Sequence, residues 1–140
     1  MDIPYTPLLR TQLEIERFWQ RLMKPLGWAH ASLWFVIVGP DDRPLPVMNE
    51  IDELPDLTSG DVAGYLAERL GGILLRRFGA GHRYVLLYSR PGRGRPTEHD
   101  RACLRALGAG LRRHAVPADV GHIATDTGIY PMAGDDILAA

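Results

Sequence analysis

The sequence predicts an α/β fold: a single three-layer domain in which a mixed β-sheet is flanked by helices. Continuous apolar runs, typical of buried strands, alternate with segments of helical periodicity, and clusters of Gly and Pro separate them. The length of 140 residues fits one domain. We expect one α/β domain over residues 1–140, with an N-terminal helical segment at 1–30, a sheet core at 31–132 and a flexible tail at 133–140.

Two helices are predicted in the first half of the chain. Residues 8–24 place apolar side chains near helical spacing until Pro25 ends the pattern. Residues 61–78 repeat apolar side chains on one helical face. The pair Gly71-Gly72 interrupts that face, so either a neighbour packs closely against it or the helix breaks there.

A third helix is predicted over residues 98–114. Thr97 precedes it, and Asp100 follows three residues later, as in a capping box. Pro117 lies just beyond the expected end. This helix follows an arginine-rich loop, so its N-terminus becomes part of the candidate site.

Apolar and β-branched runs predict the strands. Residues 31–38 and 82–89 have the composition of buried strands, 43–47 forms a short returning strand, and 119–125 forms a last strand before a hairpin. The resulting order of helices and strands predicts a partly parallel sheet with an antiparallel pair near the N-terminus.

Composition excludes several classes of protein. Hydrophobic residues make up 46% and charged residues 24%, which excludes wholesale disorder. One cysteine excludes a disulfide scaffold and a zinc site built from cysteines. No apolar stretch approaches the roughly 20 residues that span a bilayer, and the start lacks the pattern of a signal peptide. We therefore expect a cytoplasmic protein with no membrane partner.

Charge is distributed unevenly along the chain. The net charge is −1, yet residues 76–113 contain ten arginines and only two acidic residues, Glu98 and Asp100. This basic segment indicates a surface for an anionic partner. The alternative is a solvated arginine face, because the whole chain has fifteen arginines against one lysine.

The loop at residues 90–97 carries three of these arginines together with two glycines. Because the first N–H groups of a helix are unpaired, the junction of this loop with the next helix is suited to an anion. Guanidinium groups bind phosphates and carboxylates in a bidentate fashion. The expected anion- or partner-binding residues are Arg90, Arg93, Arg95, Arg101 and Arg105. The alternative is a mobile turn with solvated arginines.

Residues 83–132 contain an ordered set of motifs. An apolar strand is followed by Pro91-Gly92, by the sequence PTEHD at 96–100 opening a leucine-rich helix, and by a strand leading into a glycine-containing hairpin. This order resembles the core of RadC-like proteins of the JAB/MPN group, with their apolar strand, HNHPSG, PSxxD and following strand. The upstream strand, turn and helix also follow the order of that family. The resemblance implies a mixed-sheet α/β domain.

The metal ligands of that family are replaced in this chain. In its active members two histidines at the strand end and the helix-opening aspartate bind zinc, and a glutamate acts as base. Here the histidine positions hold Tyr88 and Arg90, and an arginine cannot bind a metal. Asp100 remains as a vestigial metal-site position, with Glu50 or Glu53 as candidates for the glutamate. The resemblance therefore implies a copy without catalytic residues, metal or cofactor.

The sequence allows two interpretations each for Asp100 and for Cys103. Asp100 either pairs with Arg90, whose guanidinium then replaces the charge of the metal, or only stabilises the helix N-terminus. Cys103 lies one turn after His99, so it is either a thiol with a lowered pKa or a buried, inert cysteine. The five histidines lack HxxxH or HExxH spacing and are expected to be surface or packing residues.

We expect a non-catalytic binding domain that docks a protein or a phosphate-bearing partner through its arginine-rich loop and helix N-terminus. A protein partner or a second copy, docking through its acidic loop at 49–56, is favoured. Nucleic acid at the basic loop is the weaker option, because a pI of about 6.5 opposes strong non-specific binding. The alternative function is a metal-dependent or other hydrolase, with an atypical site between the 49–56 loop and residues 90–100.

Overall fold

A computed structural model describes Ile3, residues 6–119 and residues 121–132, so the predicted tail at 133–140 lies outside the described residues. The described residues form a five-stranded mixed sheet and three helices, which confirms the predicted fold class. In chain order the elements are α1 (Gln12–Leu22), β1 (Ser32–Val38), β2 (Pro44–Ile51), α2 (Gly60–Arg77), β3 (Arg83–Ser89), α3 (Glu98–Arg113), β4 (His122–Thr125) and β5 (Gly128–Pro131).

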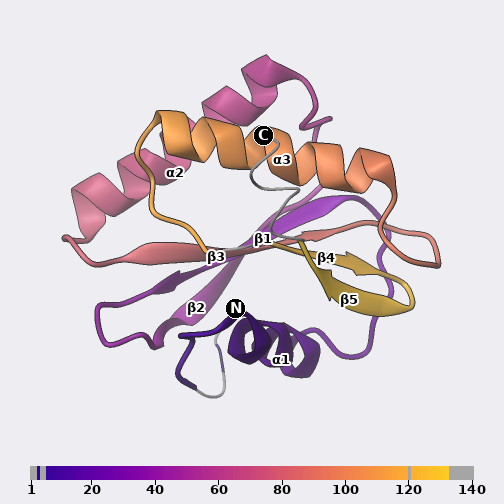
Figure 1. Ribbon diagram of the computed structural model, residues 1–140, viewed down its shortest axis with the longest axis horizontal. Coiled ribbons are helices and arrows are strands. Elements are labelled where there is room, and N and C mark those ends of the chain that lie inside the picture. The colour runs from indigo at the N-terminus through magenta and orange to yellow at the C-terminus, as the bar shows by residue number, and fades with distance from the viewer. Residues whose placement is uncertain (1–2, 4–5, 120, 133–140) are drawn as a thin grey trace.

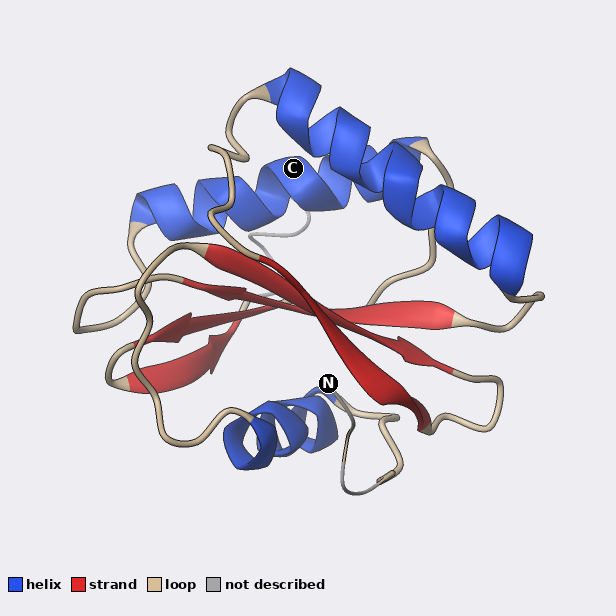
Figure 2. Cartoon of the chain, turned by 180° about the vertical axis from the view of Figure 1, so that it is seen from behind, coloured by secondary structure: helices blue, strands red, loops and turns tan. Residues whose placement is uncertain are grey.

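The sheet has the strand order β2-β1-β3-β4-β5. β1 pairs antiparallel with β2 and with β3, as predicted for the N-terminal pair. β4 runs parallel to β3 because α3 crosses over between them. Helices α2 and α3 cover one face of the sheet and α1 covers the other (Figure 1), and the view from behind shows the same three layers (Figure 2).

The two central strands, β1 and β3, are buried on both faces. Alternate side chains of β3, Tyr84, Leu86 and Tyr88, belong to the core beneath α2 and α3, whereas Val85 and Leu87 belong to the core shared with α1. This division follows from the two-residue period of a strand. Arg90 follows the end of β3 and continues the alternation of Tyr84, Leu86 and Tyr88. Its side chain is therefore directed toward α3.

Three predicted boundaries are corrected by the structure. α1 begins at Gln12 rather than residue 8, because Thr11 forms a capping box with Glu14. β2 continues to Ile51, because its pairing with Leu33 of β1 extends beyond the predicted end at residue 47. β4 begins at residue 122 rather than 119.

The glycine pair of α2 sits inside an unbroken helix. A Cβ atom on Gly71 would lie 2.9 Å from Cγ2 of Val116, so a neighbour packs closely at this point. This is one of the two outcomes that the sequence allows. Across the described ranges, the structure contains no helix with both the length and the apolar character needed to cross a membrane.

Candidate functional site

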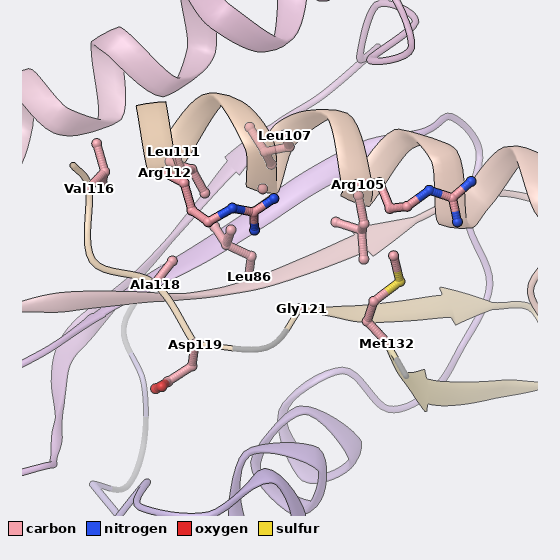
Figure 3. Close-up of a pocket in the computed structure, with 12 residues that line it drawn as sticks. Leu86, Arg105, Leu107, Leu111, Arg112, Val116, Ala118, Asp119, Gly121 and Met132 are labelled. Carbon is pink, nitrogen blue, oxygen red and sulfur yellow. The ribbon is translucent and has the colours of Figure 1, made fainter. Parts of the chain in front are cut away.

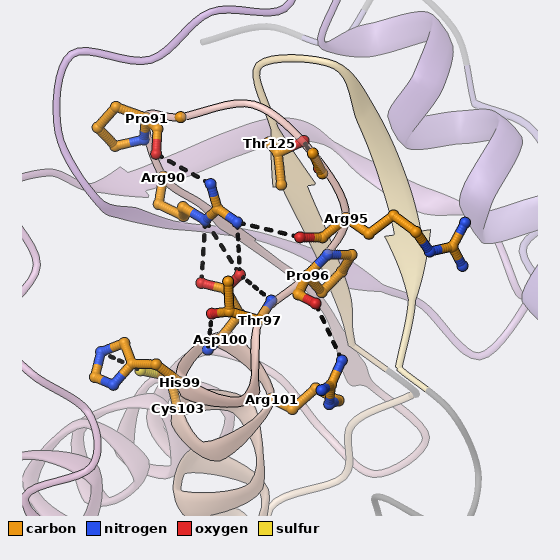
Figure 4. Close-up of polar contacts among 12 residues, drawn as sticks. Arg90, Pro91, Arg95, Pro96, Thr97, His99, Asp100, Arg101, Cys103 and Thr125 are labelled. Carbon is orange, nitrogen blue, oxygen red and sulfur yellow. Dashed lines mark hydrogen bonds and ion pairs between the residues drawn. The ribbon is translucent and has the colours of Figure 1, made fainter.

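The centre of the candidate site is an ion pair between the end of β3 and the start of α3. Nε of Arg90 donates to Oδ1 and Oδ2 of Asp100, each at 3.1 Å, and Nη2 donates to Oδ2 at 2.9 Å (Figure 4). Asp100 is 2% exposed. The pairing of Asp100 with Arg90, one of the two alternatives that the sequence left open, is therefore present in the structure.

Asp100 also caps α3. Its Oδ2 accepts a 2.8 Å hydrogen bond from the N–H of Thr97, and its own N–H donates to Oγ1 of Thr97 at 3.2 Å. Burial by itself would raise the pKa of Asp100, but the hydrogen bonds from Arg90 and Thr97 outweigh burial and hold that pKa below its usual value. The carboxylate is thus ionised and serves both roles that the sequence suggested.

The positions of the family's zinc ligands do not fit a metal here. Arg90 covers the carboxylate of Asp100 with its guanidinium, and a second cation beside it would be repelled. Tyr88 is buried, and burial raises the pKa of its phenol, which therefore keeps its proton. Arg90 and Asp100 are thus paired with each other, while the hydroxyl of Tyr88 contacts the sulfur of Cys103.

The candidate glutamates lie elsewhere. Glu50 is opposite Trp34 in the pairing of β1 with β2, and Trp34 packs against the core on the α1 face. Glu50 accepts a 2.9 Å hydrogen bond from Oγ of Ser32 on the same face. Glu53 follows β2, with Oε1 at 3.8 Å from Nε2 of His30. The sheet therefore separates Glu50 from Asp100.

The arginine-rich loop is fastened to the turn between β4 and β5. The N–H of Gly92 donates to Oδ2 of Asp126 at 2.9 Å, and the N–H of Gly94 donates to Oγ1 of Thr127 at 3.0 Å. Oγ1 of Thr125 donates to the carbonyl of Gly94 at 2.7 Å. The glycine N–H groups are thus used within the chain, and the loop has a defined shape.

The five predicted arginines fall into two groups. Arg90, Arg101 and Arg105 are paired with carboxylates: Arg90 with Asp100, and the other two with Glu98. Neither Arg93 nor Arg95 forms an ion pair with any residue that the structure describes.

Arg95 lies on an aromatic ring of β5. Its guanidinium carbon is 5.2 Å from the centroid of the Tyr130 ring, and Figure 4 shows the side chain extending away from Arg90. A depression of about 230 Å³ adjoins this pair. Arg101 and Pro96 also line the depression, so it presents cationic and apolar groups side by side.

A separate apolar pocket of about 170 Å³ lies between α3 and the chain leading to β4. Figure 3 shows Leu86, Leu107 and Leu111 at this pocket, with Arg105 and Arg112 extending from α3. The pocket does not include the Arg90–Asp100 pair.

A further cluster brings together three possible metal ligands, Asp56, His99 and Cys103. Nε2 of His99 lies 3.6 Å from Sγ of Cys103 and 3.8 Å from Oδ1 of Asp56. The spacing of His99 and Cys103 was visible in the sequence. Asp56 was missed, because it precedes α2 and only the packing of α2 beside α3 brings it here. Burial raises the pKa of the Cys103 thiol, which favours a protonated thiol over an activated nucleophile.

No protein-family model, no curated protein and no solved structure matches this chain. The resemblance to RadC-like proteins therefore stays a prediction from the sequence motifs.

Proposed function

We propose that this chain is a non-catalytic binding domain that docks an acidic segment of a protein through Arg93 and Arg95. The observation that carries this proposal is the contrast within the arginine cluster. Arg93 and Arg95 are exposed and have no carboxylate among the described residues, whereas Arg90 and its neighbours on α3 are paired. Exposed guanidinium groups bind carboxylates in a bidentate geometry.

The anchored loop supports a recognition role. Hydrogen bonds from Gly92 and Gly94 to the β4–β5 turn hold the loop before a partner arrives. A preordered surface loses less conformational entropy on binding. Stacking on Tyr130 holds one face of the Arg95 guanidinium and leaves its N–H edges for a ligand.

Charge pairing favours a protein over a polyphosphate or nucleic acid. Glu98 neutralises part of the positive charge of Arg101 and Arg105, and Asp100 neutralises Arg90. Binding to a phosphate backbone depends on many uncompensated cations. Two arginines without a carboxylate partner among the described residues, one of which lines a depression of mixed cationic and apolar character, match a short acidic segment with one bulky side chain.

A labelled peptide tests the proposal. We would titrate the full chain into a fluorescein-labelled peptide with the sequence of residues 49–57, the acidic segment of this chain, and record fluorescence anisotropy. We expect saturable binding that weakens at least about tenfold in the Arg93→Ala/Arg95→Ala variant. The matched control is Arg76→Ala/Arg77→Ala, which removes two exposed arginines from the end of α2 and leaves binding unchanged.

Two results would contradict this function. Equal binding by both double variants, or equal binding of a peptide with Gln and Asn in place of Glu and Asp, would remove the role of Arg93 and Arg95. Displacement of the peptide by inorganic pyrophosphate at lower concentration than by free peptide would replace the protein partner with a phosphate-bearing one. Sedimentation velocity then tells whether the full chain self-associates, as it does if the acidic segment of a second copy is the partner.

A further inference from the structure

The cluster of Asp56, His99 and Cys103 combines three different ligand types from two separate parts of the chain. His99 and Cys103 project from the first turns of α3, and Asp56 belongs to the segment before α2. The three ligand atoms all lie within 4.8 Å of one another. Arg93 and Arg95 are not among these ligands, so the inference does not rest on the function proposed for them, although Asp56 belongs to the 49–57 segment used as the test peptide.

The spacing around Nε2 of His99 is close to that of a tetrahedral metal site, with Oδ1 of Asp56 about 0.4 Å beyond the ideal distance. With Zn–S near 2.3 Å and Zn–N near 2.0–2.1 Å, tetrahedral angles place the sulfur and the nitrogen about 3.6 Å apart, and nitrogen and oxygen about 3.4 Å apart. Nε2 of His99 lies 3.6 Å from Sγ of Cys103 and 3.8 Å from Oδ1 of Asp56. Small side-chain rotations of Asp56, which is exposed, complete the arrangement.

The arrangement does not suit a nucleophile activated by a catalytic triad. In a triad one ring nitrogen of the histidine faces the nucleophile and the other faces the carboxylate. Here both Cys103 and Asp56 face the same nitrogen, Nε2 of His99. Two potential ligands converging on one imidazole nitrogen leave a shared space for an ion.

Hydrogen bonds from the surroundings orient two of the ligands. The backbone N–H of Leu57 and the hydroxyl of Tyr88 both contact the sulfur of Cys103. The N–H and the hydroxyl of Thr58 donate to Oδ1 of Asp56, at 3.0 and 2.7 Å. Such outer contacts orient metal ligands in proteins.

We propose that Asp56, His99 and Cys103 bind one divalent zinc-class ion. A thiolate, an imidazole and a carboxylate are ligands typical of zinc, whereas magnesium and calcium prefer oxygen ligands alone. His99 and Asp56 have side chains 60% and 59% exposed, so the fourth coordination position faces solvent. The ion ties the segment before α2 to the first turns of α3.

Cobalt substitution tests this site directly. We would titrate Co²⁺ into the purified full chain, stripped of metal, and record the near-ultraviolet sulfur-to-cobalt charge-transfer absorption and the visible bands of tetrahedral Co²⁺. We expect saturation at one Co²⁺ per chain and displacement by Zn²⁺. The Cys103→Ser variant loses the charge-transfer band. His99→Ala and Asp56→Asn each weaken Co²⁺ binding at least about tenfold.

The controls separate a built site from an incidental one. His114→Ala removes another exposed histidine, at the end of α3, and leaves Co²⁺ binding unchanged. His99 and Asp56 are exposed, so their variants keep the fold, which circular dichroism verifies. Absence of a charge-transfer band, or equal Co²⁺ affinity in wild type, His99→Ala and Asp56→Asn, overturns the proposal. Loss of peptide binding in Arg93→Ala/Arg95→Ala has no bearing on these outcomes.

Discussion

The guanidinium of Arg90 lies against both carboxylate oxygens of Asp100, at the point where β3 ends and α3 begins. The side chains are 15% and 3% exposed, so water screens this pair little. The contact links the central strand of the sheet to the helix that crosses over it.

Removal of Arg90 is expected to destabilise the domain strongly. Arg90→Met keeps much of the side-chain volume but leaves the buried charge of Asp100 with only the Thr97 N–H, so we expect a loss of about 3 kcal/mol in the free energy of unfolding. Urea unfolding followed by circular dichroism measures this loss. Arg90→Met/Asp100→Asn should be more stable than Arg90→Met, because no unpaired charge remains buried. The opposite order would show that the pair contributes little.

Stability should fall in acid through the same carboxylate. The folded-state pKa of Asp100 lies below its unfolded value of about 3.9. Its contribution is therefore complete above the unfolded pKa and disappears as the pH falls through the folded pKa. We expect the urea midpoint of wild type to drop more steeply than that of Asp100→Asn below about pH 4. If the urea midpoints of wild type and Asp100→Asn fall equally with pH, the acid sensitivity arises from other carboxylates.

Two glycines of α2 should respond to alanine in opposite ways. Gly71→Ala places a methyl group 2.9 Å from Cγ2 of Val116, a stiff side chain, so we expect a loss of about 1–2 kcal/mol. A Cβ on Gly64 meets no atom within 4 Å, and Gly64→Ala should gain about 0.5–1 kcal/mol from helix propensity. Thermal unfolding compares the two variants. Gly71→Ala combined with Val116→Ala should relieve the clash, and a gain in Gly71→Ala alone would disprove the close packing.

Loss of Asp126, which fastens the arginine-rich loop, should weaken peptide binding even though every arginine is kept. Asp126 accepts hydrogen bonds from the N–H groups of Trp28, at 3.2 Å, and Gly92, at 2.9 Å. Asp126→Ala frees the loop, so we expect binding of the 49–57 peptide to weaken several-fold because the loop must order on binding. Anisotropy titration measures this change, with Asp61→Ala, at the start of α2, as a control carboxylate. Unchanged affinity would show that a fixed loop is not needed.

Local signals allowed much of the fold to be predicted. The capping box of Thr97 with Asp100 and the apolar run at 82–89 each depend on residues close in sequence, and both appear as expected. The start of α1 was wrong for a non-local reason. Leu9 fits helical spacing, yet its N–H donates to the carbonyl of Asp42, and Leu9 is buried outside the helix.

The candidate site was likewise predicted only in part. The sequence placed Arg90, Asp100 and the neighbouring arginines around one loop, and the pairing of the first two follows from the directions of β3 and α3. It did not reveal that Glu98 would hold both Arg101 and Arg105. Side-chain pairing among many arginines depends on which carboxylate lies within reach, and composition does not contain that distance.

The sequence by itself determined the α/β class, the order of helices and strands and the capped start of α3, because each follows from residues a few positions apart. The tertiary structure alone decided which arginines keep an exposed charge. It also alone brought Asp56 to His99 and Cys103. Such contacts join residues far apart in the chain, and their distances are set by how α2 and α3 pack together on the sheet.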